Sequence, residues 1–114
     1  MAEREHRLYP LSADSIDYIE SAGNYVIIRV GSVNYISRDS IKRLAVELGD
    51  NGFIRIQRSL LVNIRSISYV ESVGRGTFAF TLSSGCCLQS SASYREAILR
   101  TLPMRRLPSR RQPA

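Results

Sequence analysis

The sequence is poor in the residues that build metal centres and nucleophilic active sites. Its 114 residues include one histidine, two cysteines and no tryptophan. His6 lies in the N-terminal segment, while Cys86 and Cys87 are adjacent, so this set is too small for a four-ligand zinc site. No other residue supplies the base that a cysteine nucleophile requires. We therefore expect no metal, no cofactor and no enzymatic activity.

Long apolar runs are also missing. The longest wholly apolar segment is "YVII" at 25–28, far short of the roughly 20 residues of a membrane helix. The opening "MAEREH" is charged, and no apolar stretch of a signal peptide follows it. Neighbouring strand residues point to opposite faces, so a disulfide between Cys86 and Cys87 would be strained. We expect free thiols, at least one of them packed, in a cytoplasmic protein without a membrane segment.

Acidic residues become scarce along the chain, whereas arginine does not. Fifteen arginines and one lysine stand against ten acids, which gives a net charge of +6. Residues 1–51 hold six bases and eight acids, residues 52–102 hold six and two, and residues 103–114 hold four and none. Because the arginine fork suits phosphates and guanine edges, this balance indicates a polyanion as partner. We expect residues 1–6 to be an N-terminal extension and residues 103–114 a disordered basic tail.

Short apolar alternations dominate the rest of the chain and predict a β-rich domain. An edge strand at "HRLY" is ended by Pro10. Further strands are expected at these segments: 16–19, 25–30, 33–37, 53–56, 60–64, 66–70, 77–82 and 86–89. Turns at 31–32, 74–76 and 83–85 each contain glycine. The predicted fold class is mainly β (α+β), with seven to nine strands and two short accessory helices.

Helical periodicity is confined to two segments. In the first, apolar residues recur at i, i+3, i+4 and i+7, namely Ile41, Leu44, Ala45 and Leu48. Ser37 or Asp39 offers an N-cap for this helix, and Gly49 offers a stop. The second helix has one face formed by Tyr94, Ala97, Ile98, Thr101 and Leu102, and it is ended by Pro103.

Four segments resemble, in order and spacing, the LytTR family of DNA-binding domains. They are "IDYIESAGNYVII", "YISRDSIKRLAVEL", "GFIRIQRSLLVNIRSI" and "LSSGCCLQSSASYREAIL", and together they cover about residues 7–102. The most specific piece is "FIRIQRSLLVN", because a generic β-domain has no reason to place Phe, Arg, Arg-Ser and Val-Asn at these separations. The resemblance implies one domain over 7–102, an elongated stack of antiparallel β-sheets.

The resemblance also implies that loops, rather than a recognition helix, enter DNA. "GNY" and "SSASY" are similar to the two loops that reach successive major grooves, and "QRS" to the loop that faces the minor groove between them. Asn24 then meets base edges, Tyr25 anchors its loop, and Arg58 lies near the minor groove or backbone. The implied DNA contacts are Gly23, Asn24, Tyr25, Arg38, Arg58, Ser59, Arg65, Ser91 and Ser93. Phosphate contacts in the basic half could come from Arg55, Arg58, Arg65 and Arg75.

Structural alternatives stand beside these roles. Asn24 also suits a plain turn, Tyr25 a core position and Arg58 a surface ion pair. Asn63 is expected to satisfy buried backbone near a strand end, and Arg65 is open between a DNA contact and a structural role.

The chain departs from the family pattern in two loops. Gln57 stands where the family usually has His, and the last loop reads Ser91-Ala92-Ser93-Tyr94 where the family commonly has Ser-Arg-x-Tyr. The missing arginine removes the usual bidentate reader of guanine, so we expect weak base discrimination at that loop. Family members usually carry a receiver or membrane sensor in front, so the chain is either a stand-alone domain or a fragment of a longer regulator.

The prediction is a sequence-specific, double-stranded DNA-binding domain of a bacterial transcription regulator, of the response-regulator type found in two-component systems. It would act on direct repeats as a homodimer or as paired monomers. One alternative is an RNA or single-strand binder that stacks bases on Tyr25, Tyr35, Tyr69 and Phe78. The other is a protein-interaction module that has lost DNA binding.

Overall fold

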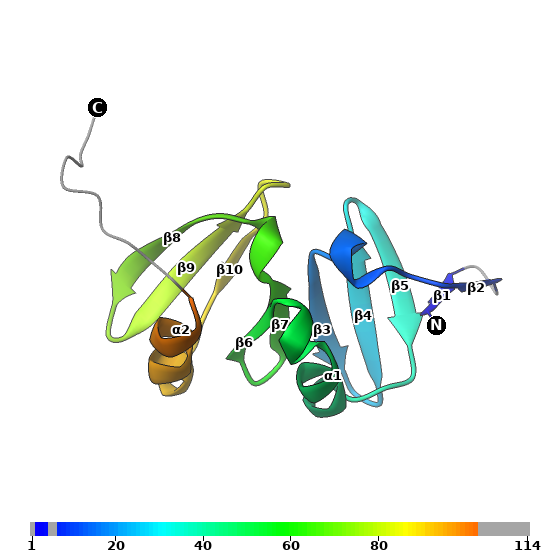
Figure 1. Ribbon diagram of the computed structural model, residues 1–114, viewed down its shortest axis with the longest axis horizontal. Coiled ribbons are helices and arrows are strands. Elements are labelled where there is room, and N and C mark those ends of the chain that lie inside the picture. The colour runs from blue at the N-terminus through cyan, green and yellow to red at the C-terminus, as the bar shows by residue number, and fades with distance from the viewer. Residues whose placement is uncertain (1, 5–6, 103–114) are drawn as a thin grey trace.

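The protein is elongated, with extents of 50 × 27 × 22 Å, and its strands form two antiparallel sheets (Figure 1). The computed structural model describes residues 2–4 and 7–102, so His6, Pro103 and the predicted tail lie outside the described residues. The larger sheet has the order β2 (Arg7–Tyr9), β1 (Ala2–Arg4), β5 (Val33–Ser37), β4 (Tyr25–Val30), β3 (Tyr18–Ala22), β7 (Leu60–Asn63) and β6 (Phe53–Gln57). The smaller sheet has the order β10 (Cys87–Gln89), β9 (Thr77–Leu82) and β8 (Ile67–Gly74). The helices are α1 (Ile41–Leu48) and α2 (Arg95–Thr101), with short 3-10 turns η1 (Ala13–Ser15), η2 (Gly49–Asn51), η3 (Ile64–Ser66) and η4 (Ala92–Tyr94). The predicted fold class is confirmed.

Strict alternation produced the most accurate strand predictions. β4 and β5 have the predicted bounds, and their two-residue link has φ +61° at Gly31. The strand predicted at 16–19 instead begins at Tyr18, because η1 precedes it. Residues 2–4, assigned to an N-terminal extension, form β1 between β2 and β5, with Glu3 opposite Ile36. The described residues therefore contain ten strands, one more than the predicted range.

Both helices form where predicted, and α1 ends before Gly49 as expected, but a different residue caps its start. Ser40 is the N-cap, since its Oγ accepts a hydrogen bond from the backbone N–H of the third helical residue at 3.1 Å. The predicted caps, Ser37 and Asp39, are wrong. Gly49 is right-handed and continues into η2, and the chain reverses at Gly52, where φ is +84°.

The β6–β7 hairpin separates two hydrophobic cores. Ile56 and Val62 face the first core, which is shared with the smaller sheet and α2, whereas Phe53 and Leu61 face the second core, beneath α1. All four residues of β7 are buried, and burial of each aliphatic side chain stabilises the fold by roughly 1.5–3 kcal/mol. Because the hairpin is packed on both faces, its turn at 58–59 is held in a defined position.

The two cysteines lie in different environments. Cys86 packs against the first core and Cys87 is exposed, and both thiols are free. Across residues 2–4 and 7–102, every helix is too short or too polar to cross a membrane.

Candidate nucleic-acid interface

Three loops lie along one long edge of the molecule, the lower edge in Figure 1. They are the β3–β4 turn at 23–24, the β6–β7 turn at 58–59, and the segment 91–93 that leads into α2. These are the loops in which the sequence predicted DNA contacts. Their order along the edge follows their order in the chain (Figure 1).

The β3–β4 turn presents Asn24 to solvent. Ala22 pairs with Tyr25 across the turn, and φ is positive at Gly23 (+66°) but not at Asn24, as in a type II′ hairpin. Asn24 is exposed, and no residue in the described part of the chain hydrogen-bonds to its side chain. Its amide therefore keeps both a donor and an acceptor for a partner.

The side chains of Arg38 and Tyr25 contact each other beside this turn. Tyr25 is 41% exposed, so it does not enter the core. Arg38 Nη2 donates to the Tyr25 hydroxyl at 3.0 Å, and the guanidinium carbon lies 5.4 Å from the ring centroid. This hydrogen bond raises the pKa of Arg38, which keeps its positive charge at any physiological pH.

A groove of about 390 Å³ runs beside the same turn. Its lining includes Asn24, Arg38 and Lys42. Lys42 was not among the predicted contacts, because helical periodicity identifies the buried face of α1 and says little about its polar face. The exposed side of the first helical turn, next to the "SR" pair, is the signal that could have indicated it.

The β6–β7 turn presents Arg58. Its side chain is exposed and has no ion pair with a described residue, so the surface ion pair is not formed. Arg55 Nη2 donates to the Arg58 carbonyl at 2.6 Å, and the Arg55 guanidinium lies 6.0 Å from the Tyr94 ring centroid. Arg55, predicted as a phosphate contact, thus braces the turn against the segment before α2.

Hydrogen bonds join the central turn to both neighbouring loops. On one side, Ser21 N donates to the Ser59 carbonyl at 3.0 Å. On the other, Gln57 Nε2 donates to the Gln89 carbonyl at 2.7 Å, and Ser91 N donates to the Ile56 carbonyl at 3.0 Å. Ser59 Oγ donates to Gln57 Oε1 at 3.0 Å, which fixes the amide. The three loops therefore form one connected surface, and backbone contacts set their spacing.

The last loop offers hydroxyls rather than a guanidinium. Ser91 Oγ and Ser93 Oγ lie 3.1 Å apart and hydrogen-bond to each other. Ala92 and Ser93 are exposed, whereas Tyr94 packs against the first core. A single exposed hydroxyl can contact a phosphate or one base atom, but it has no bidentate geometry.

The family profile described as the LytTr DNA-binding domain matches residues 6–102. The chain belongs to this family. The sensory transduction protein LytR of Staphylococcus haemolyticus is 26% identical over 95 residues, which are 83% of this chain and 37% of that protein. The solved LytTr DNA-binding domain of a response regulator from Bacillus cereus has a TM-score of 0.84 at 19% identity and covers 90% of this chain and 94% of its own, which shows the shared fold. The chain thus spans little more than a third of the length of LytR.

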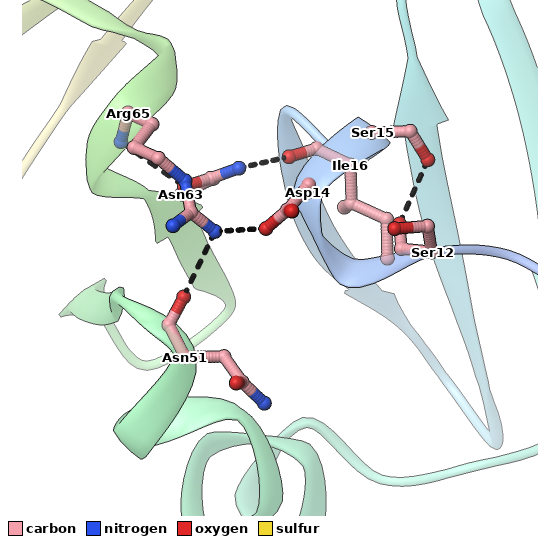
Figure 2. Close-up of polar contacts among 7 residues, drawn as sticks. All are labelled: Ser12, Asp14, Ser15, Ile16, Asn51, Asn63 and Arg65. Atoms are coloured by element: carbon pink, nitrogen blue, oxygen red, sulfur yellow. Dashed lines mark hydrogen bonds and ion pairs between the residues drawn. The ribbon is translucent and has the colours of Figure 1, made fainter.

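In this LytTr domain, Arg65 lies apart from the three loops. It follows β7 at the opposite end from the 58–59 turn. Figure 2 shows that its guanidinium forms an ion pair with Asp14. The same guanidinium donates a hydrogen bond to the Asn51 carbonyl at 3.3 Å. These contacts tie η1 and η2 to η3, and they favour the structural role for Arg65.

Asn63 has the structural role that the sequence predicted. It is fully buried, and its amide donates to the Ile16 carbonyl at 2.8 Å while its Oδ1 accepts from the Arg65 backbone N–H at 3.0 Å (Figure 2). Both polar ends of the buried side chain are therefore satisfied.

The aromatic residues of the LytTr domain do not form a stacking surface for single strands. Phe78 is buried in the first core, and Tyr35 packs against the second core and the Tyr9 ring. Tyr25 and Tyr69 are exposed, but they lie on different sheets. Among the residues that the structure describes, no three His, Cys, Asp or Glu side chains gather in a way that could hold a metal ion.

Proposed function

We propose that this LytTr domain binds double-stranded DNA in a sequence-specific manner as part of a bacterial transcription regulator. The first and last loops would enter successive major grooves, with the central turn against the minor groove between them. The observation that carries the proposal is the connected edge, on which Asn24 and Arg58 have no side-chain partner in the described chain. Membership of a DNA-binding family supports it, and that family is not a class of enzymes.

The dimensions and chemistry of the edge fit duplex DNA. Successive major grooves on one face of B-DNA are about 34 Å apart, and the long axis of the domain is 50 Å. The Asn24 amide matches the donor and acceptor pair on an adenine edge. Arg58 suits the strong negative potential of a narrow minor groove, and Ser59, Ser91 and Ser93 suit phosphate oxygens.

The regulator around the domain is also part of the proposal. The matching LytR protein is longer than this chain, which agrees with a receiver or sensor in front of the domain. Direct repeats one helical turn apart would place two protomers on one face of the DNA, either as a homodimer or as paired monomers. We expect this to take place in the cytoplasm, where duplex DNA is accessible.

Equilibrium binding to duplex DNA over a range of salt concentrations tests the proposal. If roughly four to six phosphates are neutralised per protomer, log K should fall with log salt at a slope of about −4 to −5. Arg58→Ala should lower affinity for target and random duplexes alike, because a minor-groove or phosphate contact carries little base information. Arg7→Ala, on edge strand β2 at the far end of the larger sheet, removes the same charge and serves as the control. A slope near zero, or equal affinities of the two variants, would contradict the proposal.

A further inference from the structure

We propose that Arg75 and Arg95 form a phosphate clamp beside the last loop and supply the positive charge that Ala92 and Ser93 lack. The two residues come from different elements, since Arg75 lies in the β8–β9 turn and Arg95 is the first residue of α2. The inference rests on the proposed function and adds a fourth element, the β8–β9 turn, to the DNA-binding edge.

Packing brings the β8–β9 turn against the last loop. A Cβ on Gly76 would lie 3.2 Å from Arg95 Cδ and 3.7 Å from Ala92 Cβ, so the turn lies close to both residues. Figure 1 shows the β8–β9 turn next to α2, at the end of the edge that holds the three loops. Arg75, the residue before Gly76, therefore stands on a turn that lies beside the loop of Ser93.

Neither guanidinium is neutralised by a residue that the structure describes. Arg75 and Arg95 are both exposed, and within residues 2–4 and 7–102 neither takes part in an ion pair. Arg43 and Arg65, by contrast, are paired with Asp39 and Asp14. The end of the edge that lacks an arginine in its loop thus still holds two positive charges that no described residue pairs with.

The backbone at Arg75 points to a role beyond the turn. Its φ is +57°, the only positive φ among the described residues other than glycine, and Gly76 follows at +77°. Such turns favour Asn or Gly at the first central position, because a longer side chain is disfavoured in the left-handed region. The strain at Arg75 is explained if its long side chain makes a contact that Asn or Gly could not make.

The test compares Arg75→Asn, Arg95→Gln and the double variant in the salt-dependent binding assay. Asn tolerates the left-handed conformation, so Arg75→Asn should fold with an unchanged or raised melting temperature. Each lost phosphate contact should reduce the salt slope by about 0.9 and, at about 0.15 M salt, weaken binding roughly fivefold on target and random duplexes alike. The double variant should weaken binding about 25-fold, and Arg7→Asn is the control with the same change of charge.

The outcomes separate the clamp from the proposed function. A wild-type chain that fails to bind duplex DNA overturns both. A wild-type chain that binds with the expected salt slope, while the double variant behaves like Arg7→Asn, overturns the clamp alone. Loss of base preference at the Ser93 end, without loss of affinity for random duplexes, would also overturn it, because Arg75 or Arg95 would then read bases rather than hold phosphate.

Discussion

The two ends of the proposed DNA-binding edge offer different chemical groups. At one end, Asn24 projects an unpaired amide from a tight turn, and Arg38 is fixed beside it by the Tyr25 hydroxyl. At the other end, the Ser91 and Ser93 hydroxyls bind each other. Positive charge there stands on neighbouring elements rather than in the loop itself. The first end has directed hydrogen-bonding groups suited to base edges, whereas the second has charge suited to a backbone.

Removal of the Asn24 amide should produce the largest effect. A bidentate base contact is worth roughly 1–3 kcal/mol, so Asn24→Ala should weaken binding to a selected duplex by about 5- to 150-fold. Binding to random duplexes should hardly change, because no phosphate contact is lost. Fluorescence anisotropy with both duplexes measures the ratio of the two affinities.

The matched control for Asn24→Ala is Asn34→Ala. Asn34 is exposed on β5 next to the β4–β5 turn, at the opposite end of β4 from the β3–β4 turn. Equal losses of affinity in the two variants would show that the β3–β4 turn does not recognise bases.

A guanidinium placed in the last loop should make the two ends more alike. Ser93→Arg adds a charge and a fork that can grip guanine, so affinity should rise about fivefold at about 0.15 M salt, with a new preference for G at that end of the site. Competition between duplexes that differ only at that end measures the preference. A variant that binds no more tightly and discriminates no better would place Ser93 away from the DNA.

The smallest effects should come from single hydroxyls. Tyr25→Phe keeps the ring but removes the acceptor for Arg38, and an exposed hydrogen bond of this kind should change affinity by about two- to threefold. Tyr69→Phe is the control, since Tyr69 is 55% exposed on the smaller sheet. Ser93→Ala should change affinity by less than about twofold, because one hydroxyl adds little to discrimination. A tenfold loss of affinity in the Ser93→Ala variant would contradict the assignment of base recognition to the Asn24 end.

Local patterns in the sequence predicted most of the strands and the positions of the turns. β4 and β9 alternate buried with less buried residues, and β5 alternates half-buried with exposed ones; such patterns are visible in the sequence without a partner strand. β1 is only three residues, Ala-Glu-Arg, and becomes a strand because β2 and β5 pair with it. The cap of α1 was missed because Ser37, Asp39 and Ser40 all have suitable side chains within four positions.

The folded chain places the predicted loops along one edge, but it gives some of the predicted arginines contacts within the domain. Arg55 and Arg58 are equally basic in the sequence, yet Arg55 braces the turn from inside while Arg58 remains exposed. Arg65 meets Asp14, which lies 51 positions away, and only the folded chain brings them together. The close approach of the turn at Gly76 to Arg95 is of the same long-range kind. Composition gives the amount of charge, and tertiary packing decides which charges stay free for a partner.

Selection of bound duplexes from a random library, followed by sequencing, tests the central claim most directly. The difference between the two ends predicts an asymmetric half-site, sharply defined where Asn24 lies and degenerate where Ser93 lies. Pairs of half-sites should recur about one helical turn apart. The Asn24→Ala protein shows which end of the motif the Asn24 loop contacts. Its selected motif should lose the sharp positions and leave the degenerate ones unchanged. A motif that is sharp at the Ser93 end and degenerate at the Asn24 end would contradict the account.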